Sequence, residues 1–169
     1  MLWFLLLSAV SSFTLKDHRR VRVTLHDGTP PWVEKQFLDH DRHRNKFTSW
    51  SVRDRFSNEV NALRALDKTD VAPRLLWANA STFTLGMTYV GKKSRPRNRQ
   101  ELMRILHALR RHGIYHEDLE ARNFCRLHGV LRVIDFGHVG LYNRGEYNES
   151  WFPRGPPRGG TPWGVGPGG

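Results

Sequence analysis

At 169 residues and 38% hydrophobic, the chain has the length of one domain and enough apolar side chains to build a core. Its 27 Lys and Arg residues against 16 Asp and Glu give a formal charge of +11, which favours anionic partners such as nucleotide phosphates, nucleic acid or acidic lipid. The single cysteine, Cys125, excludes an intramolecular disulfide and a cysteine-based zinc site, and it predicts a reducing, cytoplasmic compartment and a small buried side chain.

The N-terminal segment, residues 1–13, begins with an apolar run over residues 1–10 that is too short to cross a bilayer as a helix. We therefore predict no transmembrane span there. Three interpretations stay open: the run is a buried first strand of the fold, it is the remnant of a longer N-terminus, or it is the core of a signal peptide, which would make the protein secreted. No Lys or Arg precedes the run, whereas a signal peptide usually carries one.

The next segment predicts a β-hairpin. Residues 21–25 alternate and are rich in strand formers, residues 26–30 contain turn formers, and residues 32–37 supply the second strand. Lys35 lies in that second strand, where a solvated strand lysine is one interpretation. The charged stretch that follows, residues 38–46, contains His and Asp but no zinc spacing, so we expect a solvated loop without a metal.

A helix is predicted over residues 51–66, where Ser51 and Asp54 have the spacing of a capping box. Its apolar face is formed, at helical spacing, by Val52, Phe56, Val60 and Leu63. Glu59 borders this face, where an unpaired carboxylate would be costly to bury. Either a cation from the element beneath the helix pairs with Glu59, or an arginine of the helix itself neutralises it.

Two more strands are predicted at residues 74–78 and 82–90, on either side of a short turn. A basic linker, residues 91–97, leads into a helix that starts at the N-cap Asn98 and stops at Gly113. The apolar face of this helix consists of Leu102, Ile105, Leu106 and Leu109. The helix delivers the chain directly into the most informative stretch of the sequence.

That stretch is His-Glu-Asp-Leu-Glu-Ala-Arg-Asn over residues 116–123, followed twelve residues later by Asp135-Phe136-Gly137. Residues between them predict a β-hairpin around His128-Gly129, with glycine where a positive φ is needed. Antiparallel pairing brings Asn123 and Asp135 to the same end of this hairpin, where their oxygens suit one Mg²⁺. With Asp118 nearby to meet a hydroxyl nucleophile, the spacing predicts a phosphotransferase site. The alternative is an Asp- and Asn-rich turn beside an ordinary hairpin.

The spacing H-x-D-x-x-x-x-N with a later D-F-G resembles the catalytic and metal-binding loops of the protein-kinase-like superfamily. The wording Asp-Leu-Glu-Ala-Arg-Asn is similar to compact, atypical members, including those found in fungi. The resemblance implies an α+β fold, with an antiparallel β-rich N-lobe that carries one packed helix, and a truncated helical C-lobe. The kinase-like domain would span residues 14–145, and a Pro- and Gly-rich tail at 146–169 would be mobile.

The same resemblance implies that ATP and Mg²⁺ are the cofactors. Asp118 would be the catalytic residue, which orients the acceptor hydroxyl and accepts its proton. Asn123 and Asp135 would bind the magnesium. The partners would then be a nucleotide and an unidentified acceptor with a hydroxyl group.

The remaining residues implied by the resemblance belong to the nucleotide. Lys35 matches the lysine of the V-A-I-K motif, so it would bind ATP phosphates and pair with Glu59. The segment that ends the N-lobe sheet would carry Met87 as gatekeeper. Backbone groups of Thr88 and Val90 would hydrogen-bond the adenine.

Three departures from the family pattern are visible. Glu120 stands where conventional Ser/Thr kinases have a lysine, and a carboxylate there would repel the transferred phosphate unless it turned away. No G-x-G-x-x-G precedes Lys35; residues 16–20, Lys-Asp-His-Arg-Arg, stand at the expected turn, where side-chain cations would replace the backbone cradle. The activation segment and the peptide-docking helices are also missing, which weakens the case for a protein substrate.

The sequence therefore predicts an atypical kinase that transfers phosphate from ATP, with Mg²⁺, to a hydroxyl acceptor, a protein Ser or Thr being one candidate. The first alternative is a pseudokinase, a nucleotide-binding interaction module without turnover, which the three departures favour. The second is a basic nucleic-acid-binding protein. The charge and the Arg-Gly pairs of the tail favour it, but no stacking or groove-reading motif does.

Overall fold

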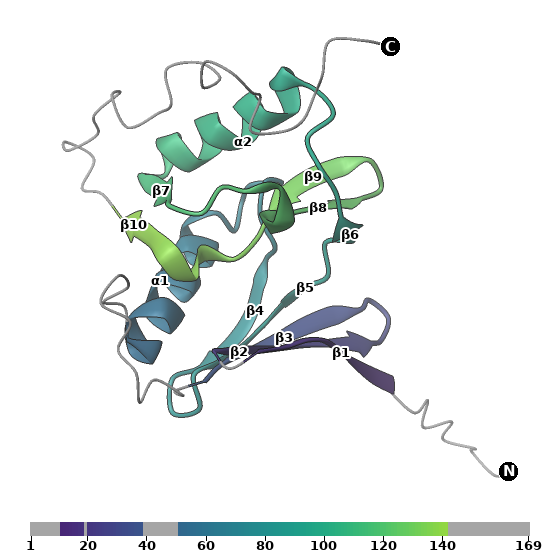
Figure 1. Ribbon diagram of the computed structural model, residues 1–169, viewed down its shortest axis with the longest axis vertical. Coiled ribbons are helices and arrows are strands. Elements are labelled where there is room, and N and C mark those ends of the chain that lie inside the picture. The colour runs from purple at the N-terminus through teal and green to yellow at the C-terminus, as the bar shows by residue number, and fades with distance from the viewer. Residues whose placement is uncertain (1–10, 19, 39–50, 142–169) are drawn as a thin grey trace, which may run out of the picture.

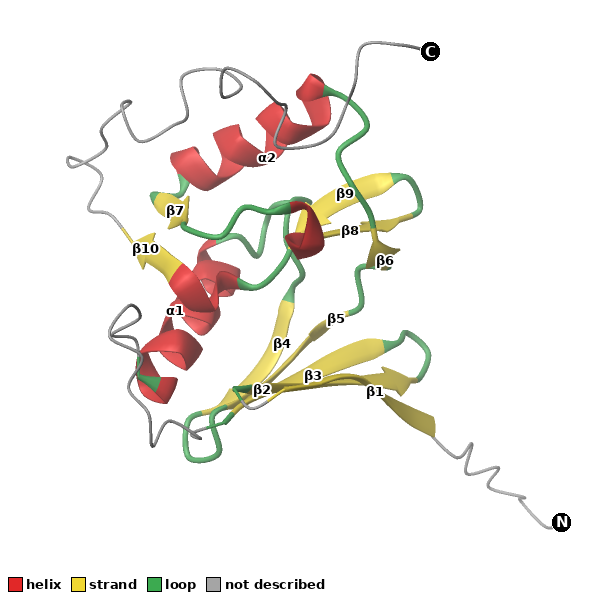
Figure 2. Cartoon of the chain, viewed as in Figure 1, coloured by secondary structure: helices red, strands yellow, loops and turns green. Residues whose placement is uncertain are grey.

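A computed structural model describes residues 11–18, 20–38 and 51–141 of the chain. Over these residues the protein is α+β, with antiparallel sheets and two α-helices (Figures 1 and 2), which confirms the coarse fold class. The predictions for the apolar N-terminal run, most of the charged loop and the Pro- and Gly-rich tail lie outside the described residues.

The largest sheet has five strands in the order β1-β2-β3-β5-β4. Its strands are β1 (Ser11–His18), β2 (Val21–Asp27), β3 (Trp32–Phe37), β4 (Leu75–Asn79) and β5 (Thr84–Thr88). The predicted hairpin is present as β2 and β3, with Val23 opposite Lys35, and Leu85 of β5 pairs with Lys35 on the other side. Lys35 therefore sits in the middle strand of the sheet.

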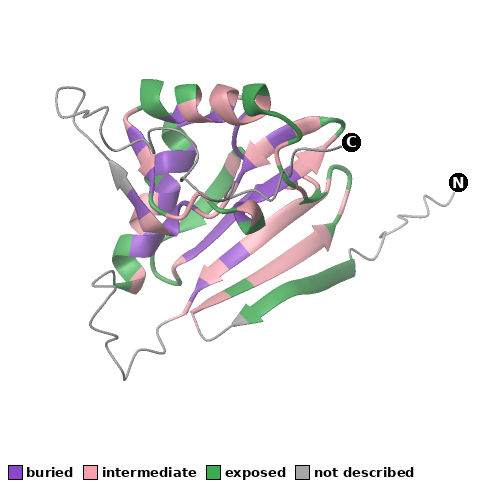
Figure 3. Ribbon diagram, turned by 45° about the horizontal axis from the view of Figure 1, so that its top comes forward, coloured by how far each residue is buried: buried purple, intermediate pink, exposed green. Residues whose placement is uncertain are grey.

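Strand β1 is the main difference from the predicted fold. The sequence predicts a turn at residues 16–20, but Lys16, Asp17 and His18 continue the strand and pair with β2, and of the described residues in this stretch only Arg20 lies in a turn. Main-chain pairing along β2 overrides the turn-like composition. Because β1 starts at Ser11, it also crosses the predicted boundary between the N-terminal segment and the domain. β1 forms an edge that is exposed over residues 11–17 (Figure 3).

Helix α1 (Val52–Ala65) matches its prediction closely. Ser51 is the N-cap and forms a reciprocal capping box with Asp54, which satisfies backbone donors that would otherwise lack partners. The apolar face buries Phe56, Val60 and Leu63. The ring of Phe56 meets that of Phe37 edge-on, with centroids 6.1 Å apart, so α1 packs directly on β3.

Helix α2 (Arg99–Arg111) is also where the sequence predicts it. The side chain of Asn98 accepts a hydrogen bond from the backbone N–H of Glu101 at 3.0 Å, and Ile105 and Leu109 are buried. The opposite face of α2 is exposed (Figure 3). Neither helix of the described residues combines the length and apolar character that crossing a bilayer requires.

Short elements complete the described chain. They are β6 (Lys92–Lys93), β7 (Ile114–His116), η1 (Ala121–Asn123), β8 (Phe124–Leu127), β9 (Val130–Val133), η2 (Phe136–His138) and β10 (Val139–Leu141). β8 and β9 form the predicted hairpin, and both His128 and Gly129 have positive φ, as a tight hairpin turn of the I′ kind demands. In the region where a truncated helical lobe is predicted, the described residues form the helix α2 and two small sheets, β10-β7 and β6-β8-β9.

The basic linker is more ordered than its composition predicts. Its Lys92 and Lys93 form β6, which pairs with β8. At Gly91, where φ is +94°, a Cβ would lie 1.9 Å from the carbonyl oxygen of Arg126, so only glycine allows this close approach.

The hydrophobic core lies between the large sheet, α1 and the segment around β7 to β10. Its largest fully buried side chains include Phe124, Phe136, Leu63 and Leu131. Cys125 is buried beside this core, and burial raises the pKa of its thiol, so the prediction of a small buried side chain is confirmed.

Candidate functional site

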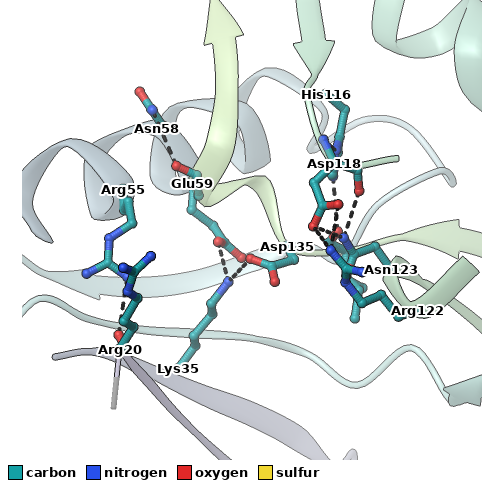
Figure 4. A network of polar contacts seen from close by, with 12 residues as sticks. Arg20, Lys35, Arg55, Asn58, Glu59, His116, Asp118, Arg122, Asn123 and Asp135 are labelled. Carbon is teal, nitrogen blue, oxygen red and sulfur yellow. Dashed lines mark hydrogen bonds and ion pairs between the residues drawn. The ribbon is translucent and has the colours of Figure 1, made fainter. Parts of the chain in front are cut away.

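Lys35 is at the centre of a buried ion-pair cluster. Its Nζ lies 2.5 Å from an oxygen of Glu59 on α1 and 2.8 Å from Oδ1 of Asp135, just after β9 (Figure 4). Lys35 is 4% exposed and Glu59 is 1% exposed. The predicted Lys35–Glu59 ion pair is therefore present. The helix arginine Arg55 donates to the backbone carbonyl of Leu38.

The electrostatics of this cluster follow from burial and from one cation shared by two carboxylates. Burial lowers the pKa of Lys35, but the nearby charges of Asp135 and Glu59 more than reverse this and raise it above its usual value. The Lys35 charge holds the pKa of Asp135 well below its usual range. Burial raises the pKa of Glu59, and Lys35 opposes that rise. Burying the Lys35–Glu59 ion pair thus carries a large desolvation cost, which makes it a candidate for a functional rather than a stabilising role.

Asp135 has a backbone conformation that is unusual for a residue with a side chain. Its φ and ψ are both 68°, in the left-handed region, where Asp is tolerated better than most residues. Such conformations cost about 1 kcal/mol or more and cluster at functional sites. Phe136, the residue after Asp135, is fully buried, and its ring meets that of His116 edge-on, with centroids 5.2 Å apart. The Asp135 side chain itself remains partly exposed, at 34%.

Asn123 joins the other end of the hairpin to the loop that carries Asp118. Its Nδ2 donates to the backbone carbonyl of Asp118 at 2.7 Å and to Oδ2 of the same residue at 3.0 Å. The backbone N–H of Ile134 donates to the carbonyl of Asn123 at 2.8 Å. The hairpin strands begin one residue after Asn123 and end two residues before Asp135, so the predicted arrangement of these two residues at the hairpin mouth is present.

The donor atoms at this mouth suit a hard divalent cation. Because Nδ2 of Asn123 faces Asp118, its Oδ1 has no partner among the described residues, and neither has Oδ2 of Asp135. A charged carboxylate and an amide oxygen are ligands that Mg²⁺ accepts when substrate phosphates complete its shell. Across residues 11–38 and 51–141, apart from residue 19, no three His, Cys, Asp or Glu side chains gather as a metal site.

Arg122 is a site residue that the sequence reasoning missed. One of its terminal nitrogens lies 2.8 Å from Oδ1 and 2.9 Å from Oδ2 of Asp118, and the other donates to Glu120 (Figure 4). Arg122 therefore neutralises Glu120, the carboxylate that stands where the family pattern has a lysine. The spacing of four residues between Asp118 and Arg122 was the available signal, since such pairs meet in turns and helices.

His116 tethers the same loop to the hairpin. Its Nε2 lies 3.2 Å from the carbonyl oxygen of Ile134, and its Nδ1 lies 3.3 Å from the backbone nitrogen of Asp118. A carbonyl only accepts and an N–H only donates, so the ring is neutral, with the proton on Nε2. Burial lowers the pKa of His116, which agrees with a neutral ring.

The neutral state of His116 predicts a pH dependence of stability. Its folded-state pKa is depressed, so this contribution is complete at high pH and is lost as the pH falls below about 6.5, where the unfolded chain takes up the proton first. Replacing His116 with Gln should make the fall in unfolding free energy between pH 8 and pH 5 smaller, because the variant has no imidazole at this position to take up a proton in that range. Urea denaturation at each pH measures this. The matched control is His107→Gln on the exposed face of α2, and an equal effect there would contradict the assignment.

The residues expected to meet the adenine are only partly available. Thr88 donates its N–H to the carbonyl of Arg74 at 2.9 Å, so this N–H is already used within the protein. The N–H of Val90 has no acceptor among the described residues. Met87, the expected gatekeeper, is buried on β5 opposite Val33.

Lys16 on β1 is a second cation near the cluster. Its charge is among those that lower the pKa of Asp135. Lys16 belongs to the stretch that stands in place of a glycine-rich loop, and it is exposed on the edge strand. The positive charge of residues 16–20 indicated that a cation from this stretch would lie near the site. The sequence did not show that this cation is Lys16.

The sequence matches no protein-family model, and no curated protein is significantly similar to it. The function of the cluster around Lys35 must therefore be inferred from its chemistry.

Proposed function

We propose that the protein is an ATP- and Mg²⁺-dependent phosphotransferase with a protein-kinase-like fold, acting on a hydroxyl acceptor. The observation that carries this proposal is that Lys35 forms ion pairs with both Glu59 and Asp135. These three residues come from segments that are far apart in the chain. A buried ion pair adds little to stability compared with apolar residues, so its presence next to a partly exposed carboxylate favours a role in binding.

Each residue has a role that its contacts suit. Lys35 binds the nucleotide phosphates and is positioned by Glu59. Asp135 and Asn123 hold magnesium through their free oxygens, and the ion neutralises charge on the phosphates when bound. Asp118 meets the acceptor: its Oδ1 accepts one hydrogen bond in the protein, which leaves a lone pair for a hydroxyl group.

In the transfer, the acceptor oxygen forms a bond to the γ-phosphorus while the bond from that phosphorus to the bridging oxygen breaks. ADP leaves, and the acceptor proton passes to the Asp118 carboxylate. Arg122 contacts both Asp118 oxygens and also pairs with Glu120, so it offsets the charge of the carboxylate that stands where conventional Ser/Thr kinases have a lysine.

A nucleotide-binding module without turnover is the second candidate. The contact between Arg122 and both oxygens of Asp118 favours it, because this carboxylate is already charge-paired without an acceptor. In that case Lys35 and Asp135 would bind ATP and magnesium, but no phosphate would be transferred. Turnover by the purified protein separates the two candidates.

Asp135→Asn tests the nucleotide and metal part of the proposal. Asn also tolerates the left-handed conformation, so the variant keeps the fold. We expect the Mg²⁺-dependent part of ATP binding, measured by calorimetry with and without the metal, to weaken by at least about tenfold, because a charged ligand is lost. Asp67→Asn removes an exposed carboxylate elsewhere and is the control. If ATP binding by Asp135→Asn depends on Mg²⁺ as much as it does in the wild type, Asp135 is not a metal ligand.

A further inference from the structure

An open cavity of about 690 Å³ lies beside the loop that carries Asp118. One wall is formed by residues 93–95, which begin with the second residue of β6, and the other by residues 119–122, directly after Asp118. Its volume is within the range of about 300–1,000 Å³ that is typical of small-molecule sites. The cavity is therefore a candidate binding site next to the proposed catalytic residue.

The charged side chains of this cavity are mostly positive. The cavity is lined by three cations, Lys93, Arg95 and Arg122, and by one carboxylate, that of Glu120. Glu120 already pairs with Arg122. Within the described part of the chain, no Asp or Glu pairs with Lys93 or Arg95. Both cations remain available, so an anionic ligand is favoured.

The wall that carries Lys93 and Arg95 is held in place by hydrogen bonds. The N–H of Ser94 donates to the carbonyl of Phe124 at 3.0 Å, and Arg126 donates to the hydroxyl of Ser94 at 3.2 Å and to the carbonyl of Arg95 at 3.1 Å. A fixed wall costs a ligand less ordering when it binds.

The charge of Arg126 is already matched inside the protein. Its guanidinium forms two bonds of 2.7 and 2.8 Å to the carboxylate of Glu101, and these bonds lower the pKa of Glu101 to about 2. Arg126 therefore braces the wall and leaves ligand binding to Lys93 and Arg95.

We propose that this cavity binds the phosphoryl acceptor, and that the acceptor is a small hydroxyl compound that carries a phosphate or carboxylate group. Lys93 and Arg95 bind the anionic group, which directs the hydroxyl toward Asp118. The nucleotide phosphates are assigned to Lys35, which lies on the other side of Asp135 from Arg122 (Figure 4). This inference rests on the proposed function for the role of Asp118, but the anion site itself does not.

The test measures binding of three related probes to the full chain: glycerol 3-phosphate, glycerate and glycerol. Calorimetry is run with and without Mg²⁺ and a non-hydrolysable ATP analogue. The proteins compared are wild type, Lys93→Ala/Arg95→Ala, and the control Lys92→Ala, which changes a lysine that is next to Lys93 in the chain but does not line the cavity. We expect at least one anionic probe to bind wild type and Lys92→Ala equally, and the double variant at least about tenfold more weakly. Neutral glycerol should not bind.

The ranking of glycerol 3-phosphate and glycerate identifies which anion the acceptor carries. Equal binding to wild type and the double variant, binding of glycerol as tight as that of the anions, or no binding of either anion would overturn the inference. Competition between the anion and the ATP analogue would also overturn it, because the cavity would then belong to the nucleotide. If the analogue does not bind but the anion still depends on Lys93 and Arg95, the phosphotransferase function fails and the anion site remains.

Discussion

Replacing Asp118 with Asn is expected to reduce the rate of phosphoryl transfer by about 10²–10⁴-fold, the usual contribution of a positioned base. The affinity for ATP should stay unchanged, because the Asp118 carboxylate acts on the acceptor in the transition state, and its hydrogen bonds within the described residues go to Arg122 and Asn123. The amide keeps an oxygen for the N–H groups of Arg122 and Asn123. Single-turnover kinetics with measured ATP affinity separate the two effects.

The neighbouring residue provides a matched control for this variant. Glu117 is exposed and adjacent, so Glu117→Gln removes the same charge without touching Arg122 or Asn123. Activity that persists equally in Asp118→Asn would show that the catalytic residue is misassigned. Wild-type protein that binds ATP but transfers no phosphate would support the nucleotide-binding module instead.

Replacing Lys35 with Met is expected to lower the free energy of unfolding by about 3–5 kcal/mol at neutral pH, the usual cost of leaving a buried charge unpaired. Glu59, at 1% exposed, would lose its cation, whereas Asp135 can be partly solvated. Guanidinium denaturation measures the loss. The control Lys68→Met changes an exposed lysine in a turn and should stay within about 0.5 kcal/mol of wild type.

The stability loss in Lys35→Met should depend on pH. Without the cation, burial raises the folded-state pKa of Glu59 above its unfolded value of about 4.3, so the variant is least impaired below that pH and loses stability as the pH rises. Adding Glu59→Gln should recover part of the loss, because the two residues act through each other. Additive losses in the double-mutant cycle would contradict the direct contact.

Much of this fold could be predicted from the sequence because the local signals are strong. The capping box of Ser51 and Asp54, the N-cap Asn98 and the His128-Gly129 turn each fix an element through interactions within a few residues. The proximity of Asn123 and Asp135 follows from the hairpin between them. Glu59 could be predicted because a carboxylate beside an apolar face needs a partner.

The features that could not be predicted depend on distant partners or on side-chain orientation. β1 forms because β2 offers main-chain partners to residues 11–14 and 16–18 of this strand. The charged composition of its C-terminal end does not indicate that pairing. The hydrogen bonds from Arg126 to residues 94–95 depend on the pairing between β6 and β8. The basic composition of the linker does not indicate that pairing. The direction of the Arg122 side chain, toward Asp118 and Glu120, is a rotamer choice within a polar loop.

The contact between Lys35 and Asp135 joins residues that are 100 positions apart, and this has a consequence for biosynthesis. At ribosomal rates of about 5–20 residues per second, roughly 5–20 s pass between the synthesis of Lys35 and that of Asp135. Glu59 emerges only 24 residues after Lys35, so the nascent chain can neutralise that cation early, once α1 docks on the sheet. The ion-pair cluster around Lys35 is then completed last, when the hairpin of β8 and β9 leaves the ribosome and brings Asp135 to a lysine that is already in place.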